Sequence, residues 1–213
     1  MRDRYHNDLA KIVDRVLELF DLVEVAITQA TEALLDQDRV AAEDVITRDA
    51  SVDAVCRDIE AAAIDVQVRQ QPVASDLRLL LAVQRIVSDL ERSGDLAKNI
   101  AKQARRRYPH VVVPEPMRET VVAMGAAAAD LIRKAAEVFV NQDAALARQI
   151  ESEDDHMDAL HRSLLAQVIS SNRSDPVETT VDLTLIGRFY ERFADHAVAI
   201  GRQVIYLSTG ELT

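Results

Sequence analysis

The sequence is poor in the residues that interrupt helices. Only 5 Gly and 5 Pro occur in 213 residues, among long tracts rich in Ala, Leu, Val, Asp and Arg. β-Proteins need frequent turn residues, whereas helices are favoured by their absence. Because 48% of the residues are hydrophobic, the chain can bury a substantial core, as one domain or as two small ones. The composition predicts an all-α protein.

Cysteine and long apolar runs are also scarce. The single cysteine, Cys56, cannot form an internal disulfide, and its apolar neighbours Val52, Val55 and Ile59 suit a buried thiol in a reducing compartment. The first residues are mostly polar, unlike a signal peptide, and no uncharged run approaches the ~18 to 20 residues of a membrane span. We therefore expect a cytoplasmic protein that meets a membrane only through its partners.

Positive charge is in deficit. Asp and Glu number 36 against 25 Lys and Arg, which gives a formal net charge of −11. A chain of this charge repels a phosphate backbone unless it carries a compensating basic stripe, so we expect no nucleic-acid partner. Arg105, Arg106 and Arg107 form a basic cluster, which we interpret as the last turn of a helix that complements the helix dipole.

Apolar residues recur at intervals of three and four, as on one face of a helix. The first such stripe covers 9–33 and stops before Asp38, a typical N-cap for a second helix over 39–68. That helix ends before Pro72, because proline disfavours helix in the residue that precedes it. A third stripe predicts a helix over 75–107.

The segment 109–116 divides the chain. It holds three of the five prolines and is typical of an extended linker. We therefore predict a first three-helix unit over 1–108 and a second over 117–213. The second unit repeats the first, since Leu34-Leu35-Asp36-Gln37-Asp38 aligns with Phe139-Val140-Asn141-Gln142-Asp143 at an offset of 105 residues. A constant offset through a helix indicates internal duplication.

Both units carry paired carboxylates at matched positions. In each unit the second helix has Asp-x-x-x-Asp and the third has Glu-x-x-x-Asp, and residues four apart share a helix face. If the two helices are antiparallel neighbours, the pairs meet along their seam and need a positive group between them. Hard oxygen donors suit Mg²⁺, Ca²⁺, Mn²⁺, Fe or Zn²⁺. The candidate metal ligands are Asp49, Asp53, Glu91, Asp95, Asp154, Asp158, Glu191 and Asp195.

The carboxylate pairs also fit two arrangements that need no metal. Arg92 and Arg192 are alternative sources of positive charge, although each points about 100° away from the acidic residue before it. The pairs are equally compatible with solvated helix faces that survived duplication, in a chain with 36 acidic residues. His196, beside Asp195, would by contrast suit a metal site in the second unit.

Three strings of the sequence resemble the PhoU family, the accessory proteins of the bacterial phosphate-specific transport system, in its actinobacterial form. They cover 1–9, 71–78 and 89–101, and the last contains Glu91 and Asp95. The resemblance spans nearly the whole chain and implies six long helices in two pseudo-symmetric three-helix bundles. It also implies small iron or zinc clusters on the eight carboxylates, which would act as metal ligands on the protein surface.

The resemblance implies a role as well. Members of the family repress phosphate-starvation signalling and restrain phosphate import when phosphate is plentiful, through the transporter ATPase and a sensor histidine kinase. We therefore expect a non-enzymatic negative regulator, as a monomer or a homodimer. The second unit has Ala199 where the first has Asn99, and His196 where the first has Leu96, so the two metal sites need not be equivalent.

Other functions of helical proteins fit the sequence less well. A ferritin-like di-iron enzyme needs Glu-x-x-His on two helices, and only Glu153 and His156 have this spacing. An all-helical nucleotide pyrophosphohydrolase needs two glutamates three apart, which the sequence lacks. A metal-free helical adaptor, whose acidic faces steer partners, stays as the main alternative.

Overall fold

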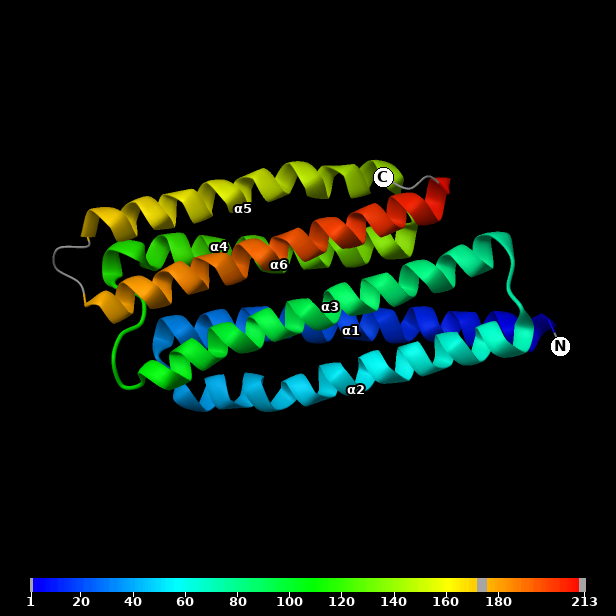
Figure 1. The fold of residues 1–213 in the computed structure, drawn as a ribbon, viewed down its shortest axis with the longest axis horizontal. Coiled ribbons are helices and arrows are strands. Elements are labelled where there is room, and N and C mark those ends of the chain that lie inside the picture. The colour runs from blue at the N-terminus through cyan, green and yellow to red at the C-terminus, as the bar shows by residue number, and fades with distance from the viewer. Residues whose placement is uncertain (1, 172–175, 211–213) are drawn as a thin grey trace.

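The structure is a computed structural model that describes residues 2–171 and 176–210. Over these residues its regular structure is helical, without a strand, and Figure 1 shows long helices stacked side by side in an elongated molecule. None of these helices is long and apolar enough to cross a bilayer. In chain order they are α1 (Arg2–Asp36), α2 (Arg39–Gln70), α3 (Ala74–Arg107), α4 (Glu115–Asn141), α5 (Ala144–Ser171) and α6 (Val177–Thr209).

The beginnings of α2 and α5 follow from one capping residue each. As predicted, Asp38 is the N-cap of α2, and its carboxylate accepts a hydrogen bond from the N–H of Val40 at 2.8 Å. In the second unit the carboxylate of Asp143 accepts from the N–H of Ala145 at 2.8 Å. The duplication therefore extends to the side chains that start these helices.

The connection between the two units is shorter than the predicted linker 109–116. Helix α4 already begins at Glu115, because Pro116 lies in the first turn, where a missing N–H breaks no helical hydrogen bond. Val112 and Val113 are buried in the core. The connector is thus a packed segment and not a free spacer.

The helices form two three-helix bundles that lie alongside each other. Helices α1, α2 and α3 pack together, as do α4, α5 and α6. Contacts of α1 with α4 and of α3 with α6 join the bundles, and Figure 1 shows α3 and α6 on the face toward the viewer. The predicted all-α fold of two pseudo-symmetric bundles is confirmed for the part of the chain that is described.

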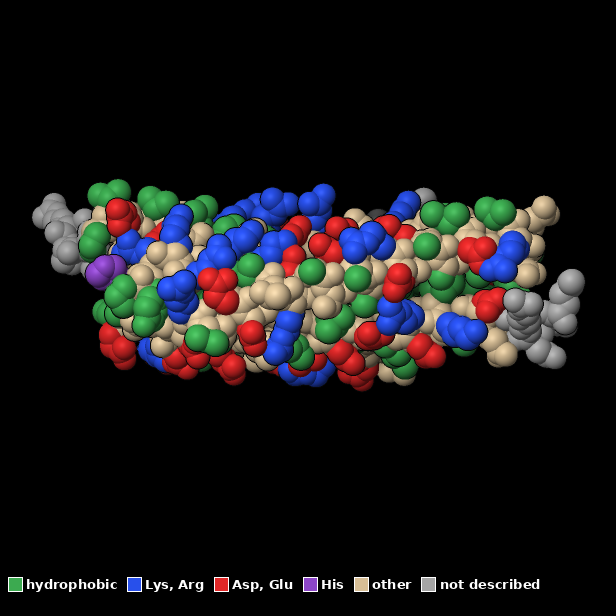
Figure 2. Space-filling model, turned by 90° about the horizontal axis from the view of Figure 1, so that it is seen from below, with side chains coloured by type: hydrophobic (Ala, Val, Ile, Leu, Met, Phe, Trp, Pro, Cys, Tyr) green, Lys and Arg blue, Asp and Glu red, His purple; other side chains and the backbone are tan. Residues whose placement is uncertain are grey.

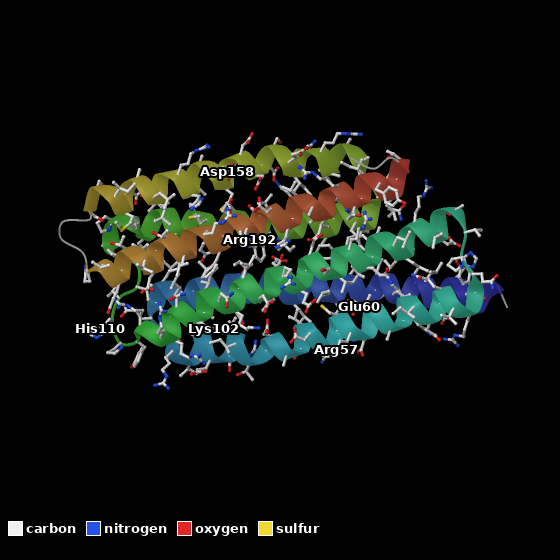
Figure 3. All side chains as sticks on the ribbon, in the orientation of Figure 1. Arg57, Glu60, Lys102, His110, Asp158 and Arg192 are labelled. Atoms are coloured by element: carbon white, nitrogen blue, oxygen red, sulfur yellow. The ribbon has the colours of Figure 1, made fainter. Side chains whose placement is uncertain are left out.

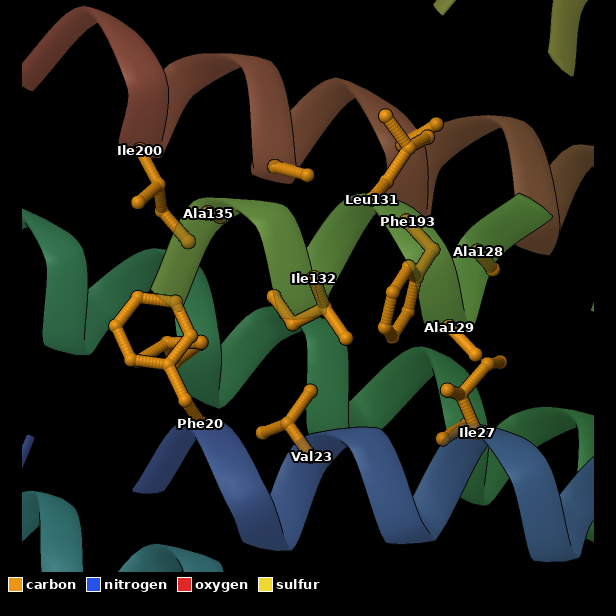
Figure 4. Packing of buried hydrophobic residues seen from close by; sticks show 14 of the residues in the cluster. Phe20, Val23, Ile27, Ala128, Ala129, Leu131, Ile132, Ala135, Phe193 and Ile200 are labelled. Atoms are coloured by element: carbon orange, nitrogen blue, oxygen red, sulfur yellow. The ribbon is translucent and has the colours of Figure 1, made fainter. Parts of the chain in front are cut away.

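One hydrophobic core runs through both bundles. Figure 4 shows Phe20, Val23 and Ile27 of α1 close to Ile132 of α4 and Phe193 of α6. All five side chains are at most 2% exposed. Burying a side chain of this size stabilises the fold by about 1.5–3 kcal/mol. The contact between the bundles is therefore an integral part of the core.

Polar groups also hold the bundles together. Thr31 Oγ1 of α1 lies 2.7 Å from the hydroxyl of Tyr190 of α6, with both groups buried. The buried carboxylate of Asp182, near the start of α6, pairs with Arg106 and Arg107 at the end of α3. The interpretation of these arginines as a helix C-terminus was therefore incomplete, because two of them bind the neighbouring bundle.

Candidate metal centre

In the first unit a lysine lies among the predicted metal ligands. Lys98 Nζ donates to Oδ2 of Asp49 and, at 2.8 Å, to Oδ1 of Asp95. Asp49 is only 9% exposed. Burial alone would lower the pKa of Lys98, but its hydrogen bonds to the two carboxylates outweigh burial and raise that pKa above its ordinary value. Lys98 is thus an internal counter-ion for the contact between α2 and α3, which we call the first seam.

The other two predicted ligands of the first unit, Asp53 and Glu91, lie near the thiol of Cys56. Burial, followed by the negative charges of Glu91 and Asp53, raises the pKa of Cys56 to about 12. The metal-free thiol is therefore protonated at neutral pH, and a cation that bound it would first have to displace this proton.

The second unit has Val198 at the position of the lysine. Burial, together with the negative charges of Asp195, Asp158 and Glu191, raises the pKa of Asp154 to about 6. The carboxylates come from α5 and α6, and Figure 3 labels Asp158 on α5. We call the contact between α5 and α6 the second seam. The predicted like-charge repulsion is present in this seam and is not relieved by a lysine.

Glu191 has a similar environment. Burial and the charge of Asp195 raise its pKa, although Arg188 and His161 oppose the rise. Oδ1 of Asp154 and Oε2 of Glu191 are buried and have no hydrogen-bond partner among the described residues. Buried carboxylate oxygens without partners are costly, so a cation bound at this seam would be strongly stabilising.

The other candidate charges and ligands lie elsewhere. Arg92 and Arg192 are exposed, and the cations that pair with predicted ligands are Lys98 and Arg188. Nδ1 of His196 lies 3.0 Å from Oδ1 of Asp89 on α3. His196 therefore links the two bundles and does not point into the second seam.

The fit to a metal ion differs between the two seams. Within the described ranges no three Asp, Glu, His or Cys side chains already converge as a cation site. In the second seam Asp195 is exposed and Asp158 half-buried, so both can rotate toward an ion at little cost. In the first seam an ion must first displace Lys98 from Asp49 and Asp95. The donor set therefore fits a hard cation better in the second unit.

Lys98 is the residue of this region that the sequence patterns did not single out. It stands three residues after Asp95, and therefore on the same side of α3. The second unit has Val198 at the matching position. This difference can be found in the sequence and indicates that the two seams differ in charge.

Two three-helix bundles with matched carboxylate pairs at their helix seams define an internally duplicated all-α protein. The PhoU domain matches the chain twice, over residues 16–104 and 121–204. The chain belongs to the PhoU family, and the resemblance inferred from the three sequence strings is confirmed.

Related proteins match along nearly their whole length. The phosphate-specific transport system accessory protein PhoU homolog 2 of Mycobacterium tuberculosis is 40% identical over 210 residues, 99% of each chain. Homolog 1 of the same organism is 42% identical over 212 residues, 100% of this chain and 96% of that one. The crystal structure of PhoU from Pseudomonas aeruginosa has a TM-score of 0.88 at 28% identity and covers 97% of this chain and 100% of its own.

Proposed function

We propose that this chain restrains phosphate uptake and phosphate-starvation signalling when phosphate is plentiful, as a non-enzymatic cytoplasmic protein. Its full-length similarity to accessory proteins of phosphate-specific transport systems carries the proposal. The proposed partners are the transporter ATPase and the sensor histidine kinase of the pathway, through which the chain, as a monomer or homodimer, reaches the membrane. An elongated scaffold of long helices offers extended faces for such docking.

Deletion of the gene tests this function. In high phosphate we expect a reporter of phosphate-uptake genes to be derepressed in the deletion strain and repressed again when the full chain is restored. Co-purification from phosphate-replete and phosphate-starved cells should recover the ATPase and the kinase. Repression that persists without the chain would overturn the proposal.

Metal binding at the carboxylate seams is part of the proposal. Fe or Zn²⁺ is proposed first, with Mg²⁺, Mn²⁺ and Ca²⁺ as alternatives for an oxygen-donor site. Asp154 and Asp158 of α5 and Glu191 and Asp195 of α6 would hold the ion, whose charge would offset their repulsion. A helix pair held in this way keeps one face fixed toward a partner. The proposed ligands of the first unit are Asp49, Asp53, Glu91 and Asp95, and we expect them to bind an ion only when Lys98 no longer pairs with Asp49 and Asp95.

A metal-free helical adaptor is the second candidate, and the ion pairs of Lys98 favour it for the first unit. Metal analysis after reconstitution separates the two, since an adaptor would hold no ion at a stoichiometric level. A di-iron enzyme is disfavoured, because it requires ligands that point into the bundle, whereas Asp195 is exposed.

A further inference from the structure

A groove of about 690 Å³ opens where α2, α3 and α6 meet. Its lining includes Arg39 of α2, three basic side chains of α3 (Lys102, Arg105 and Arg106) and Phe189 of α6. Figure 3 places Lys102 on α3, and in Figure 2 Lys and Arg side chains gather along the upper edge of the molecule. A chain with a net charge of −11 thus concentrates positive charge in one groove.

Two of these four cations are engaged by carboxylates. Oε2 of Glu43, the acidic residue of the lining, lies 3.2 Å from Nη1 of Arg105. Arg106 pairs with Asp182, which lies outside the groove lining. These two arginines therefore hold neighbouring helices together as well as facing the groove.

The other two cations lack a counter-ion among the residues that the structure describes. Nζ of Lys102 makes one long hydrogen bond, 3.5 Å to Oδ1 of Asn99, and this partner is a neutral carboxamide. Arg39 is exposed at the beginning of α2, and its guanidinium makes no hydrogen bond or ion pair with a described residue. The groove is therefore positively charged after its internal pairs are counted.

The second unit lacks this cluster of cations on the matching helix pair, where Arg148, at the position of Glu43, is an exposed cation that donates to the carbonyl of Ala144. Ala144 stands at the position of Arg39, and Arg202 stands at that of Lys102. Nη2 of Arg202 lies 2.6 Å from Oε1 of Glu151, so its charge is paired. Because the duplicate folds without cations in the places of Arg39, Arg105 and Arg106, the clustering of four cations in the first unit is not a need of the fold.

We propose that this groove binds a small anion that carries two or more phosphoryl groups. Guanidinium, ammonium and carboxamide donors match phosphoryl oxygens. Asn99, Lys102 and Arg106 follow one face of α3 over roughly 10 Å, which exceeds a single phosphate group. Inorganic polyphosphate and nucleoside triphosphates share this chemistry, and the half-buried ring of Phe189 would serve a nucleobase as a stacking surface.

Calorimetric titration of the full chain measures whether the groove binds such an anion. The probes are orthophosphate, pyrophosphate, inorganic triphosphate and ATP, each titrated in the presence of a chelator at a fixed ionic strength. We expect triphosphate to bind one to one, more tightly than orthophosphate and more weakly as salt is added. Lys102→Gln and Arg39→Gln should each lower the affinity by about tenfold or more, because each removes a charge-assisted hydrogen bond. Both side chains are accessible to solvent, so circular dichroism should show an intact fold.

Arg202→Gln is the matched control, since it removes a cation at the equivalent place of the second unit and should leave the affinity unchanged. Equal affinity for triphosphate and ATP would support a polyphosphate ligand. Tighter binding of ATP would support a nucleotide ligand. The proposal is overturned if no probe binds, if orthophosphate binds as tightly as triphosphate, or if the Lys102 and Arg39 variants bind as the original chain does. The result is independent of the regulatory function, which the deletion strain tests.

Discussion

Asp49 and Asp154 stand at the same position of two copies of one helix, but their environments differ because of a third residue. Lys98 supplies a cation to Asp49, whereas Val198 leaves Asp154 among like charges. The duplicated backbone therefore places its cations differently in the two seams. In the first, Lys98 pairs with the buried Asp49, whereas in the second the charge of Asp154 is relieved only by a proton or an external cation.

Replacing Lys98 should destabilise the first seam. Lys98→Met removes the cation that pairs with Asp49 and Asp95, and Asp49 is largely buried. We therefore expect a loss of about 2 kcal/mol in the free energy of unfolding. Urea denaturation in the presence of a chelator measures it. Lys102→Met, one turn along α3 and without a carboxylate partner among the described residues, is the control and should change stability little.

Asp154 should make stability depend on pH. Its pKa of about 6 lies above the ordinary value, so the folded state binds this proton more tightly than the unfolded state does. The original chain therefore loses stability as the pH rises through 6, and Asp154→Asn loses less because this titrating group is absent. After allowance for solvent screening, the variant should be more stable by about 1 kcal/mol above pH 7, or roughly 2–4 °C in Tm.

Thermal unfolding in chelator between pH 4 and pH 8 checks this dependence. The difference in Tm between Asp154→Asn and the original chain should be small at pH 4, where both side chains are neutral, and should grow toward pH 8. A difference that stays constant over this range, or one that shrinks, would contradict the electrostatic account of the second seam.

Among the helices, the contact between the end of α3 and the start of α6 depends on one buried charge. Asp182 is 1% exposed, so Asp182→Asn leaves Arg106 and Arg107 without their shared carboxylate. We expect a loss of about 3 kcal/mol by urea denaturation. Glu178→Gln, which removes an exposed partner of Arg107, is the control and should cost about 0.5 kcal/mol or less. Equal losses would contradict the role of Asp182.

The helices themselves were largely predictable, because their signals are local. The apolar stripe of α3 and the N-cap Asp38 both depend on residues within a few turns, and both predictions hold. The linker was predicted less well, since its prolines indicate a break but not that Val112 and Val113 are buried against other helices. Burial of this kind depends on packing that composition does not encode.

The candidate sites were predictable only in part for the same reason. The repeat identified which carboxylates are equivalent, but a periodic pattern does not show where a long side chain reaches. Lys98 reaches α2, and Arg107 reaches α6. The groove around Lys102 is lined by residues of α2, α3 and α6. Because α6 belongs to the other bundle, the groove depends on how the two bundles are joined.

For the molecule as a whole, the shared core implies that neither bundle is independent. A fragment covering residues 1–113 would expose Phe20, Val23 and Ile27, which the complete chain buries between the bundles. We expect this fragment to self-associate, as measured by light scattering after gel filtration, whereas the full chain unfolds as one unit. A well-folded monomeric fragment would contradict the single core.

Counting metal ions per chain after reconstitution and removal of excess metal tests the central claim, that the two seams differ in their need for a cation. We expect about one ion in the original chain, an additional ion in Lys98→Met, and none in Asp154→Asn or in Val198→Lys, which would place a counter-ion in the second seam. Two ions in the original chain, or a count that Val198→Lys and Asp154→Asn leave unchanged, would contradict the account.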